Sequence, residues 1–151
     1  MTQALLIRPV APADAIIWER MRTALWPDES GSHAAEIARY FGHQRTNPLE
    51  VLMACSGSGT PVGFVEMSIR PYAEGCVSDR VAFVEGWFVE PEHRGRGVGA
   101  ALMAAAEEWG RARHCSELAS DTQSFNENSI AAHKALGFEE VERLVCFKKS
   151  L

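Results

Sequence analysis

The chain has 151 residues, of which 46% are hydrophobic and 23% charged, and its formal net charge is −5. This length suffices for one well-packed core and is short for two, so we expect a single domain over residues 1–151. The acidic charge argues against a nucleic-acid surface and no apolar stretch reaches membrane-spanning length, so we expect neither nucleic acid nor membrane as a partner.

The first half of the chain mixes helical and strand patterns. In chain order we predict a strand over residues 5–8, a helix opened by Pro12-Ala13-Asp14 and stopped by Pro27, a second helix over 34–43, and strands over 49–55 and 61–70. Ser56-Gly57-Ser58-Gly59 suits a hairpin turn between the last two strands.

The second half alternates strands and helices around a glycine-rich turn. In chain order we predict a loop over residues 71–79, a strand over 81–89, a helix over 100–110, a short strand over 117–120, a helix over 126–136 capped by Gly137, and a final strand over 141–148. This order does not alternate as a doubly wound nucleotide fold does. We therefore expect an α+β fold, a central mixed sheet flanked by about four helices.

The cysteines and the N-terminus indicate a reducing compartment. Cys55, Cys76, Cys115 and Cys146 are widely spaced and form no Cys-x-x-Cys pair, so we expect neither a disulfide framework nor a metal site. The first eight residues lack the basic start and long apolar core of a secretory leader. We expect a cytoplasmic protein.

Arg94-Gly95-Arg96-Gly97-Val98-Gly99 joins the central strand to its helix and suits a diphosphate. Glycines let backbone N–H groups converge, the helix adds its unpaired N-terminal donors, and the arginines supply countercharge. Gly95-x-Gly97-x-x-Ala100 also satisfies a relaxed dinucleotide fingerprint, but no regular β-α-β array surrounds it, and the ending of a Walker loop is absent. A plain strand-to-helix connection is the other alternative, against which the two arginines argue.

Residues 81–110 resemble the coenzyme-binding part of the GNAT superfamily of acetyl-CoA-dependent N-acetyltransferases. Arg94-x-x-Gly97-x-Gly99 is similar to the family's pyrophosphate motif. The segment from Asn126 to Gly137-Phe138 is similar to its second coenzyme-contacting helix. The resemblance implies a GNAT-like fold, acetyl-CoA as acetyl donor, and no metal.

The same resemblance implies which residues contact the coenzyme. They are Trp87, Phe88, Val89, Arg94, Gly95, Arg96, Gly97, Val98, Gly99, Ala100 and Asn126. In the family the N–H at Trp87 polarises the thioester carbonyl, while the next two residues align the pantetheine arm. The Trp87 indole can also be a core group, and Asn126 an ordinary helix cap.

A closer resemblance covers nearly the whole chain. Leu25-Trp26-Pro27, Phe83-Val84-Glu85-Gly86, Ala119-Ser120-Asp121-Thr122 and the run from Gly137 to Arg143 together are similar to the aminoglycoside 6'-N-acetyltransferases, which are resistance enzymes. This implies transfer of acetyl to the 6'-amine of a cationic aminoglycoside, and a homodimer. The substrate residues it implies are Trp26, Tyr72, Glu85, Asp121 and Glu142.

Glu85 is a carboxylate in a largely apolar strand, and burying it without a partner would be costly. We favour a substrate ammonium as this partner, with Glu85 helping to bind and deprotonate the attacking amine. The alternative is an internal salt bridge, for instance to Arg70 or Arg80.

The other implied substrate residues also have local explanations. Several separated carboxylates suit a substrate with several ammonium groups, and aromatic faces pack on sugar rings. Alternatively, Asp121 caps a turn or helix, Glu142 is a solvated edge charge, Trp26 anchors a helix end and Tyr72 is a loop residue without a special role.

His133 lies where many GNAT enzymes have a tyrosine that protonates the coenzyme A thiolate. Histidine, with an unperturbed pKa near 6.5, can take this role, or it can pack and leave protonation to solvent. Glu85, Trp87 and His133 are thus the candidate catalytic residues.

We expect direct attack in a ternary complex, because no cysteine occupies an evident nucleophile site beside a base. Two other functions remain open. One is a GNAT enzyme for another cationic amine, such as a polyamine, a protein N-terminus or a lysine; the other is a non-catalytic acyl-CoA-binding module.

Overall fold

The computed structural model describes residues 4–29 and 31–151, so the first three residues of the segment in which we expect no leader lie outside it. The strands are β1 (Leu6–Pro9), β2 (Glu50–Cys55), β3 (Pro61–Arg70), β4 (Val81–Val89) and β5 (Leu118–Ser120). The helices are α1 (Ala15–Leu25), α2 (His33–Phe41), α3 (Val98–Ala112) and α4 (Glu127–Ala135). Short 3-10 turns cover η1 (Pro12–Asp14), η2 (Pro27–Glu29) and η3 (Pro91–His93).

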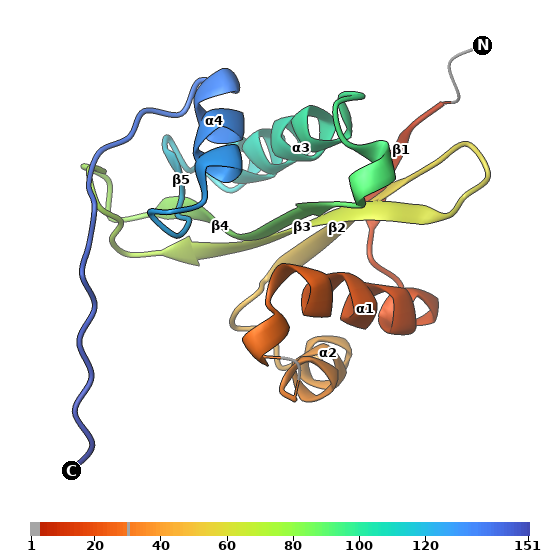
Figure 1. The fold of residues 1–151 in the computed structure, drawn as a ribbon, viewed down its shortest axis with the longest axis horizontal. Helices are drawn as coiled ribbons and strands as arrows, with labels where there is room; N and C mark the ends of the chain where they lie inside the picture. Colours follow the sequence, from red (N-terminus) through yellow and green to blue (C-terminus); the bar gives the residue numbers. More distant parts are fainter. Residues whose placement is uncertain (1–3, 30) are drawn as a thin grey trace.

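The strands form one mixed sheet in the order β1-β2-β3-β4-β5. Neighbours from β1 to β4 are antiparallel, and β5 is parallel to β4. Helices α1 and α2 cover one face of the sheet, and α3 and α4 lie on the other (Figure 1). The predicted mixed α+β fold is confirmed. Within the described residues, no helix is long and apolar enough to cross a membrane.

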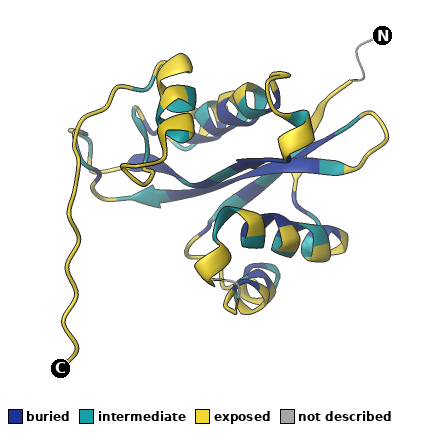
Figure 2. Cartoon of the chain, in the orientation of Figure 1, coloured by how far each residue is buried: buried dark blue, intermediate teal, exposed yellow. Residues whose placement is uncertain are grey.

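Hydrophobic side chains fill the space on both faces of the sheet. Trp18 and Met21 of α1 lie one turn apart and are buried against one face, while Leu102 and Ala106 of α3 are buried against the other. Because both faces are covered, the middle strands are buried along most of their length (Figure 2).

Helix α3 begins two residues earlier than the sequence predicts. Gly97 has φ +84° and is the residue before the helix, so Val98 and Gly99 belong to its first turn. The glycine-rich turn therefore ends at Gly97, because this left-handed residue already directs the chain into the helix.

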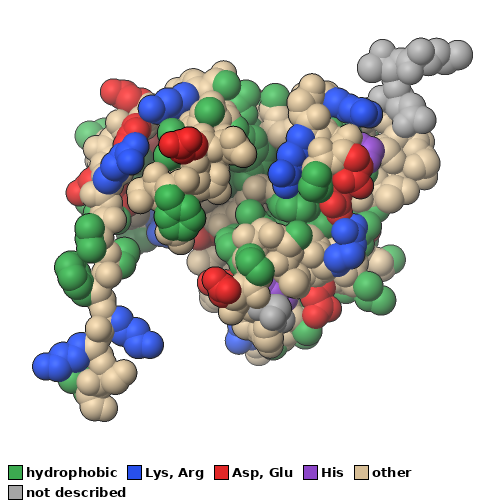
Figure 3. All heavy atoms as spheres, in the orientation of Figure 1, with side chains coloured by type: hydrophobic (Ala, Val, Ile, Leu, Met, Phe, Trp, Pro, Cys, Tyr) green, Lys and Arg blue, Asp and Glu red, His purple; other side chains and the backbone are tan. Residues whose placement is uncertain are grey.

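The predicted final strand over residues 141–148 is wrong for this chain. Residues 139–151, which we call the tail, are exposed and belong to neither helix nor strand. Figure 1 shows the tail running away from the sheet, and Figure 3 shows hydrophobic side chains along it. A strand needs a neighbour for its backbone hydrogen bonds, and the tail leaves the sheet that would supply one.

Candidate functional site

The short length of β5 leaves part of one edge of β4 open. Leu118–Ser120 of β5 pair only with residues 82–84 of β4. In the described part of the chain, no strand lies beside residues 85–89 of β4 on that side. Backbone groups there are free to meet a ligand.

Two hydrogen bonds at the ends of β4 fix the direction of the open N–H groups. The Ala82 N–H donates to the Glu117 carbonyl at 3.1 Å and so faces β5, whereas the Glu90 N–H donates to the Val62 carbonyl of β3 at 2.8 Å. Counting back from Glu90 with the period of two of a strand, the N–H groups of residues 87 and 89 point away from β3. Two N–H donors thus lie along the open edge.

A bulge at Glu85 produces this direction. Met67 of β3 faces Val84 and the preceding Glu66 faces Gly86, so Glu85 is an extra residue in β4. The extra residue reverses which N–H groups face β5. The next residue, Gly86, lies directly against the Trp26 ring, since a Cβ added to Gly86 would lie 2.5 Å from that ring.

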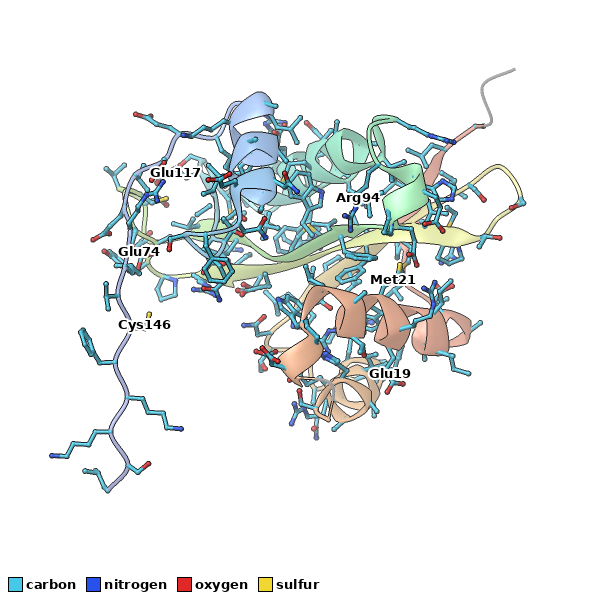
Figure 4. All side chains as sticks on the ribbon, in the orientation of Figure 1. Glu19, Met21, Glu74, Arg94, Glu117 and Cys146 are labelled. Carbon is cyan, nitrogen blue, oxygen red and sulfur yellow. The ribbon has the colours of Figure 1, made fainter. Side chains whose placement is uncertain are left out.

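The turn after β4 exposes its backbone. Gly95 and Gly97 have φ of +73° and +84°, and an added Cβ at either would meet nothing within 4 Å. The Arg94 Nε donates to the Val89 carbonyl at 2.7 Å, so this side chain folds back towards the strand (Figure 4). Arg96 is exposed, as a countercharge for a bound anion must be.

The other predicted contacts at the turn differ in what they offer. The Val98 side chain is buried in the core, so only its backbone is available to a ligand. Ala100 is exposed on the first turn of α3. Phe88 is buried on the opposite side of the sheet, against Phe64, so its part in aligning a ligand is limited to its backbone.

The Trp87 indole joins β4 to the first turn of α3. Its Nε1 donates to the Gly99 carbonyl at 3.1 Å, and its ring packs edge-to-face on His133 with centroids 5.1 Å apart. The side chain therefore has the packing role that we weighed as an alternative, while its N–H lies at the open edge.

Helix α4 borders this edge with a capped N-terminus and one histidine. The Asn126 side chain accepts a hydrogen bond from the Ser129 N–H at 3.1 Å, so it is a helix cap. His133 Nδ1 lies 2.7 Å from the Ser129 carbonyl, which only accepts, so Nδ1 carries a proton. In the neutral ring Nε2 then accepts from the Ser120 hydroxyl, 2.8 Å away.

Glu85 is paired with Arg70, as in the internal salt bridge that we weighed. Arg70 Nε lies 2.9 Å from Oε1 of Glu85 and its Nη2 lies 2.7 Å from Oε2. The Ser68 hydroxyl also donates to Oε1. Arg80 lies elsewhere, with its Nε donating to the Arg113 carbonyl.

Two more carboxylates surround Arg70, and we call Glu74, Glu85 and Asp121 the acidic cluster. Partial shielding from water raises the pKa of Asp121 above its usual value, and the other two carboxylates raise that pKa further, whereas Arg70 opposes them. The hydrogen bonds from Glu85 raise the pKa of Arg70. The site is therefore acidic around one internal cation; Glu74 is labelled in Figure 4.

The remaining predicted substrate residues differ in their exposure and in the groups that they contact. Trp26 is half-buried at the end of α1, its ring 5.2 Å from the Arg22 guanidinium. Tyr72 is 65% exposed just beyond β3. Glu142 is exposed at the start of the tail, and no contact joins it to Glu85 or Asp121.

Sequence reasoning missed two polar groups beside the site. Ser120 ends β5 directly before Asp121 and bonds His133. Glu66 is 1% exposed, accepts from the Trp18 indole at 2.9 Å and lies 3.0 Å from Arg22. Glu66 carried the same signal as Glu85, a carboxylate in an apolar strand. Among residues 4–29 and 31–151, no group of three or more His, Cys, Asp or Glu is placed to hold a metal ion.

Comparison with known proteins gives relatives of named activity. The profile of the "Acetyltransferase (GNAT) family" matches residues 18–138. An "Aminoglycoside N(6')-acetyltransferase type 1" from Klebsiella aerogenes is 49% identical over 152 residues, covering 100% of both chains.

Two solved structures extend this likeness to the fold. Aminoglycoside N-acetyltransferase AAC(6')-Iy in complex with CoA superposes with a TM-score of 0.89 at 35% identity, covering 100% of this chain and 98% of that one. AAC(6')-Iy with the bisubstrate analog CoA-S-monomethyl-acetylneamine gives a TM-score of 0.87 at 37% identity, covering 98% and 99%.

Proposed function

The chain belongs to the acetyltransferase (GNAT) family, and from this premise we propose that it transfers the acetyl group of acetyl-CoA to the 6'-amino group of aminoglycoside antibiotics. The observation that carries the proposal is the open edge of β4 lying directly beside the acidic cluster. The edge suits a thioester arm, and the cluster suits an amine with several positive charges. The relatives at full-length coverage are named for this reaction.

The open edge and the turn fit acetyl-CoA. We propose that the N–H groups of Trp87 and Val89 hydrogen-bond the acetyl-bearing arm and that the exposed backbone at Gly95 and Gly97 receives the pyrophosphate, with Arg96 as countercharge. Acetyl-CoA supplies the activated acetyl group. The other proposed contacts are Phe88, Arg94, Val98, Gly99, Ala100 and Asn126.

The proposed reaction is direct attack. The amine nitrogen bonds the thioester carbonyl carbon, the carbon–sulfur bond breaks, the nitrogen loses a proton, and the coenzyme thiolate gains one. The Trp87 N–H stabilises the oxyanion formed in between. Burial and the Glu117 carboxylate raise the pKa of the Cys76 thiol, and Cys146 lies on the tail (Figure 4), so neither favours an acetyl-cysteine intermediate.

His133 is the proposed proton source for the thiolate. The neutral ring keeps its proton on Nδ1, bonded to the Ser129 carbonyl. Nε2 can donate only when the ring is an imidazolium. The acid role of His133 is therefore tied to its charged form.

We propose that the substrate binds between the acidic cluster and two aromatic side chains. Glu85 and Asp121 attract ammonium groups, and the faces of Trp26 and Tyr72 pack on the sugars. Val141 packs on Gly75, so Glu142 leaves the body beside the loop that carries Tyr72. It would add a further carboxylate there.

We propose a homodimer in which the tail of each copy pairs with the sheet of the other. Phe147 and Val145 are 92% and 79% exposed in one copy, and the tail has a strand-like sequence. β5 is an edge strand, which a further strand can extend. We also infer that residues 1–151 form one acetyltransferase domain that works in the cytoplasm, where acetyl-CoA is available.

Coenzyme A release by the purified protein tests the proposed function. Acetyl-CoA is offered with kanamycin A, which has a 6'-amine, and with a matched 6'-hydroxyl analogue. We expect release only with the amine. Release with polyamines or peptides but with neither drug would show that this GNAT enzyme acts on another cationic amine.

A further inference from the structure

Arg70 lies among the three carboxylates of the acidic cluster, whose charges all act on it. It ends β3, and its guanidinium lies 3.6 Å from the centre of the Phe83 ring. The Arg70 side chain is 39% exposed, and that of Glu85 is 12% exposed. The pair is therefore at the surface of the site, where a substrate can reach it.

The contacts of Arg70 fix the orientation of Glu85. The planar fork of the guanidinium meets both carboxylate oxygens, at 2.9 and 2.7 Å, and Ser68 adds a second donor to Oε1. A carboxylate accepts about four hydrogen bonds, so these three leave room for about one more donor. An amine at the mouth of the site is a suitable donor.

The charge of Arg70 acts on the whole cluster. Three carboxylates act on it from different elements: Glu85 from β4, Asp121 after β5, and Glu74 from the loop after β3. Glu66 of β3 acts on this group through Glu85, and His133 of α4 acts on it through Asp121. Without Arg70, the three carboxylates would repel one another, and no cation between them would offset their charge. Because Arg70 lowers the pKa of Asp121, its loss would raise that pKa.

We propose that Arg70 is a positioning residue for acetyl transfer, which holds the Glu85 carboxylate in one orientation and supplies the positive charge around which the acidic cluster receives a polycationic amine. This rests on the proposed function. Arg70 acts through Glu85 and Asp121 rather than on the reacting atoms.

Two variants distinguish the effect of the two-point hydrogen bonding by the guanidinium from the effect of its positive charge. Arg70→Gln removes both, whereas Arg70→Lys keeps the charge and loses the fork. Arg80→Gln is the matched control, because Arg80 is an exposed arginine whose Nε bonds the Arg113 carbonyl instead of the cluster. Thermal unfolding verifies that each variant is folded.

The pH dependence of kcat/KM with kanamycin A is the first readout. For R70Q we expect kcat about 10- to 100-fold lower, with the acid limb of the profile shifted to higher pH. For R70K we expect lower kcat with the acid limb where it is in the wild type. A wild-type profile for R70Q, or the same shift in both variants, overturns the proposal.

The NMR titration of the Asp121 carboxyl carbon is the second readout and needs no activity. We expect a higher pKa in R70Q and an unchanged pKa in R70K; equal values in all forms refute the charge role. If the wild type does not acetylate aminoglycosides, the proposed function fails, while this titration still decides the charge role. Should R70Q not fold, Ser68→Ala loosens Glu85 alone, and we expect lower kcat with an unmoved acid limb; unchanged kcat refutes the orientation role.

Discussion

Glu66 shows how one buried carboxyl group ties a helix to the sheet under the site. Its carboxylate is held between the Trp18 indole and Arg22, and the Arg22 Nη2 continues to Glu36 at 2.5 Å. Arg22 also lies against the Trp26 ring. A chain of charged groups thus links the core to the aromatic side chain that borders the site.

The stability of the protein should depend on the protonation of Glu66. Burial raises the pKa of Glu66 to about 7, although Arg22 opposes this. Its pKa in the unfolded chain is about 4.3. Between these values the folded state holds the proton more tightly, so this group makes the free energy of unfolding fall as pH rises, by up to about 1.4 kcal/mol per unit.

Glu66→Gln removes this dependence. Urea unfolding of the wild type and E66Q at a series of pH values from about 4.5 to 7 measures it. We expect the wild type to lose stability relative to E66Q across this window. A constant difference between them would show that Glu66 does not titrate there.

Gly86→Ala should displace Trp26. The added Cβ would lie 2.5 Å from the Trp26 ring, so the ring or the strand must move. We expect a loss of about 1–3 kcal/mol in stability and a higher KM for the aminoglycoside. In a double-mutant cycle with Trp26→Ala, the stability cost of G86A should largely disappear; additive effects would rule out the contact.

At the scale of elements, β4 and the turn after it form two adjoining parts of the candidate site. The bulge at Glu85 turns the N–H groups of residues 87 and 89 towards the open edge. The Trp87 indole then fixes that edge to Gly99 in the first turn of α3. Strand and helix N-terminus are thus held in one arrangement, which we propose receives the two ends of the coenzyme.

Gly97→Ala tests the turn. Gly97 has φ +84° with nothing within 4 Å of an added Cβ, so the substitution costs backbone strain alone, about 1–2 kcal/mol. We expect a higher KM for acetyl-CoA and an unchanged KM for the aminoglycoside. Gly59→Ala is the control, since Gly59 has φ +87° and an equally open position in the hairpin turn. If both variants raise the acetyl-CoA KM equally, the turn has no special role.

At the scale of the whole molecule, the tail is the segment that does not pack into the fold of a single copy. Its apolar side chains are exposed, whereas most of those in the helices and the sheet are buried against each other. Removing that apolar surface from water is a driving force for association. In the dimer that we propose, the sheet edge of a second copy would cover this surface.

Phe147→Asp should break the proposed dimer. The side chain is 92% exposed in one copy, so the change should leave the folding of that copy intact. Sedimentation velocity should give a dimer for the wild type and a monomer for F147D. Val77→Asp, at a side chain 97% exposed outside the tail, should remain dimeric. A monomeric wild type refutes the dimer.

Much of the fold, and the glycine-rich turn that we propose for the coenzyme, could be predicted from the sequence, because their signals are local. Hydrophobic periodicity sets the helices and strands, and the turn from Arg94 to Gly97 is contiguous. The final strand failed because an apolar pattern gives the capacity to pair but not the strand to pair with.

The tertiary structure alone decided which charged groups meet. Arg70 and Glu85 were named as possible partners, but their pairing depends on the register of β3 and β4, and Ser120 meets His133 only because β5 and α4 pack together. Glu66 and Arg22 are likewise distant in sequence. The sequence determined the elements because backbone preferences act between near neighbours; the contacts of the site required the fold because hydrogen bonds and charges act through space.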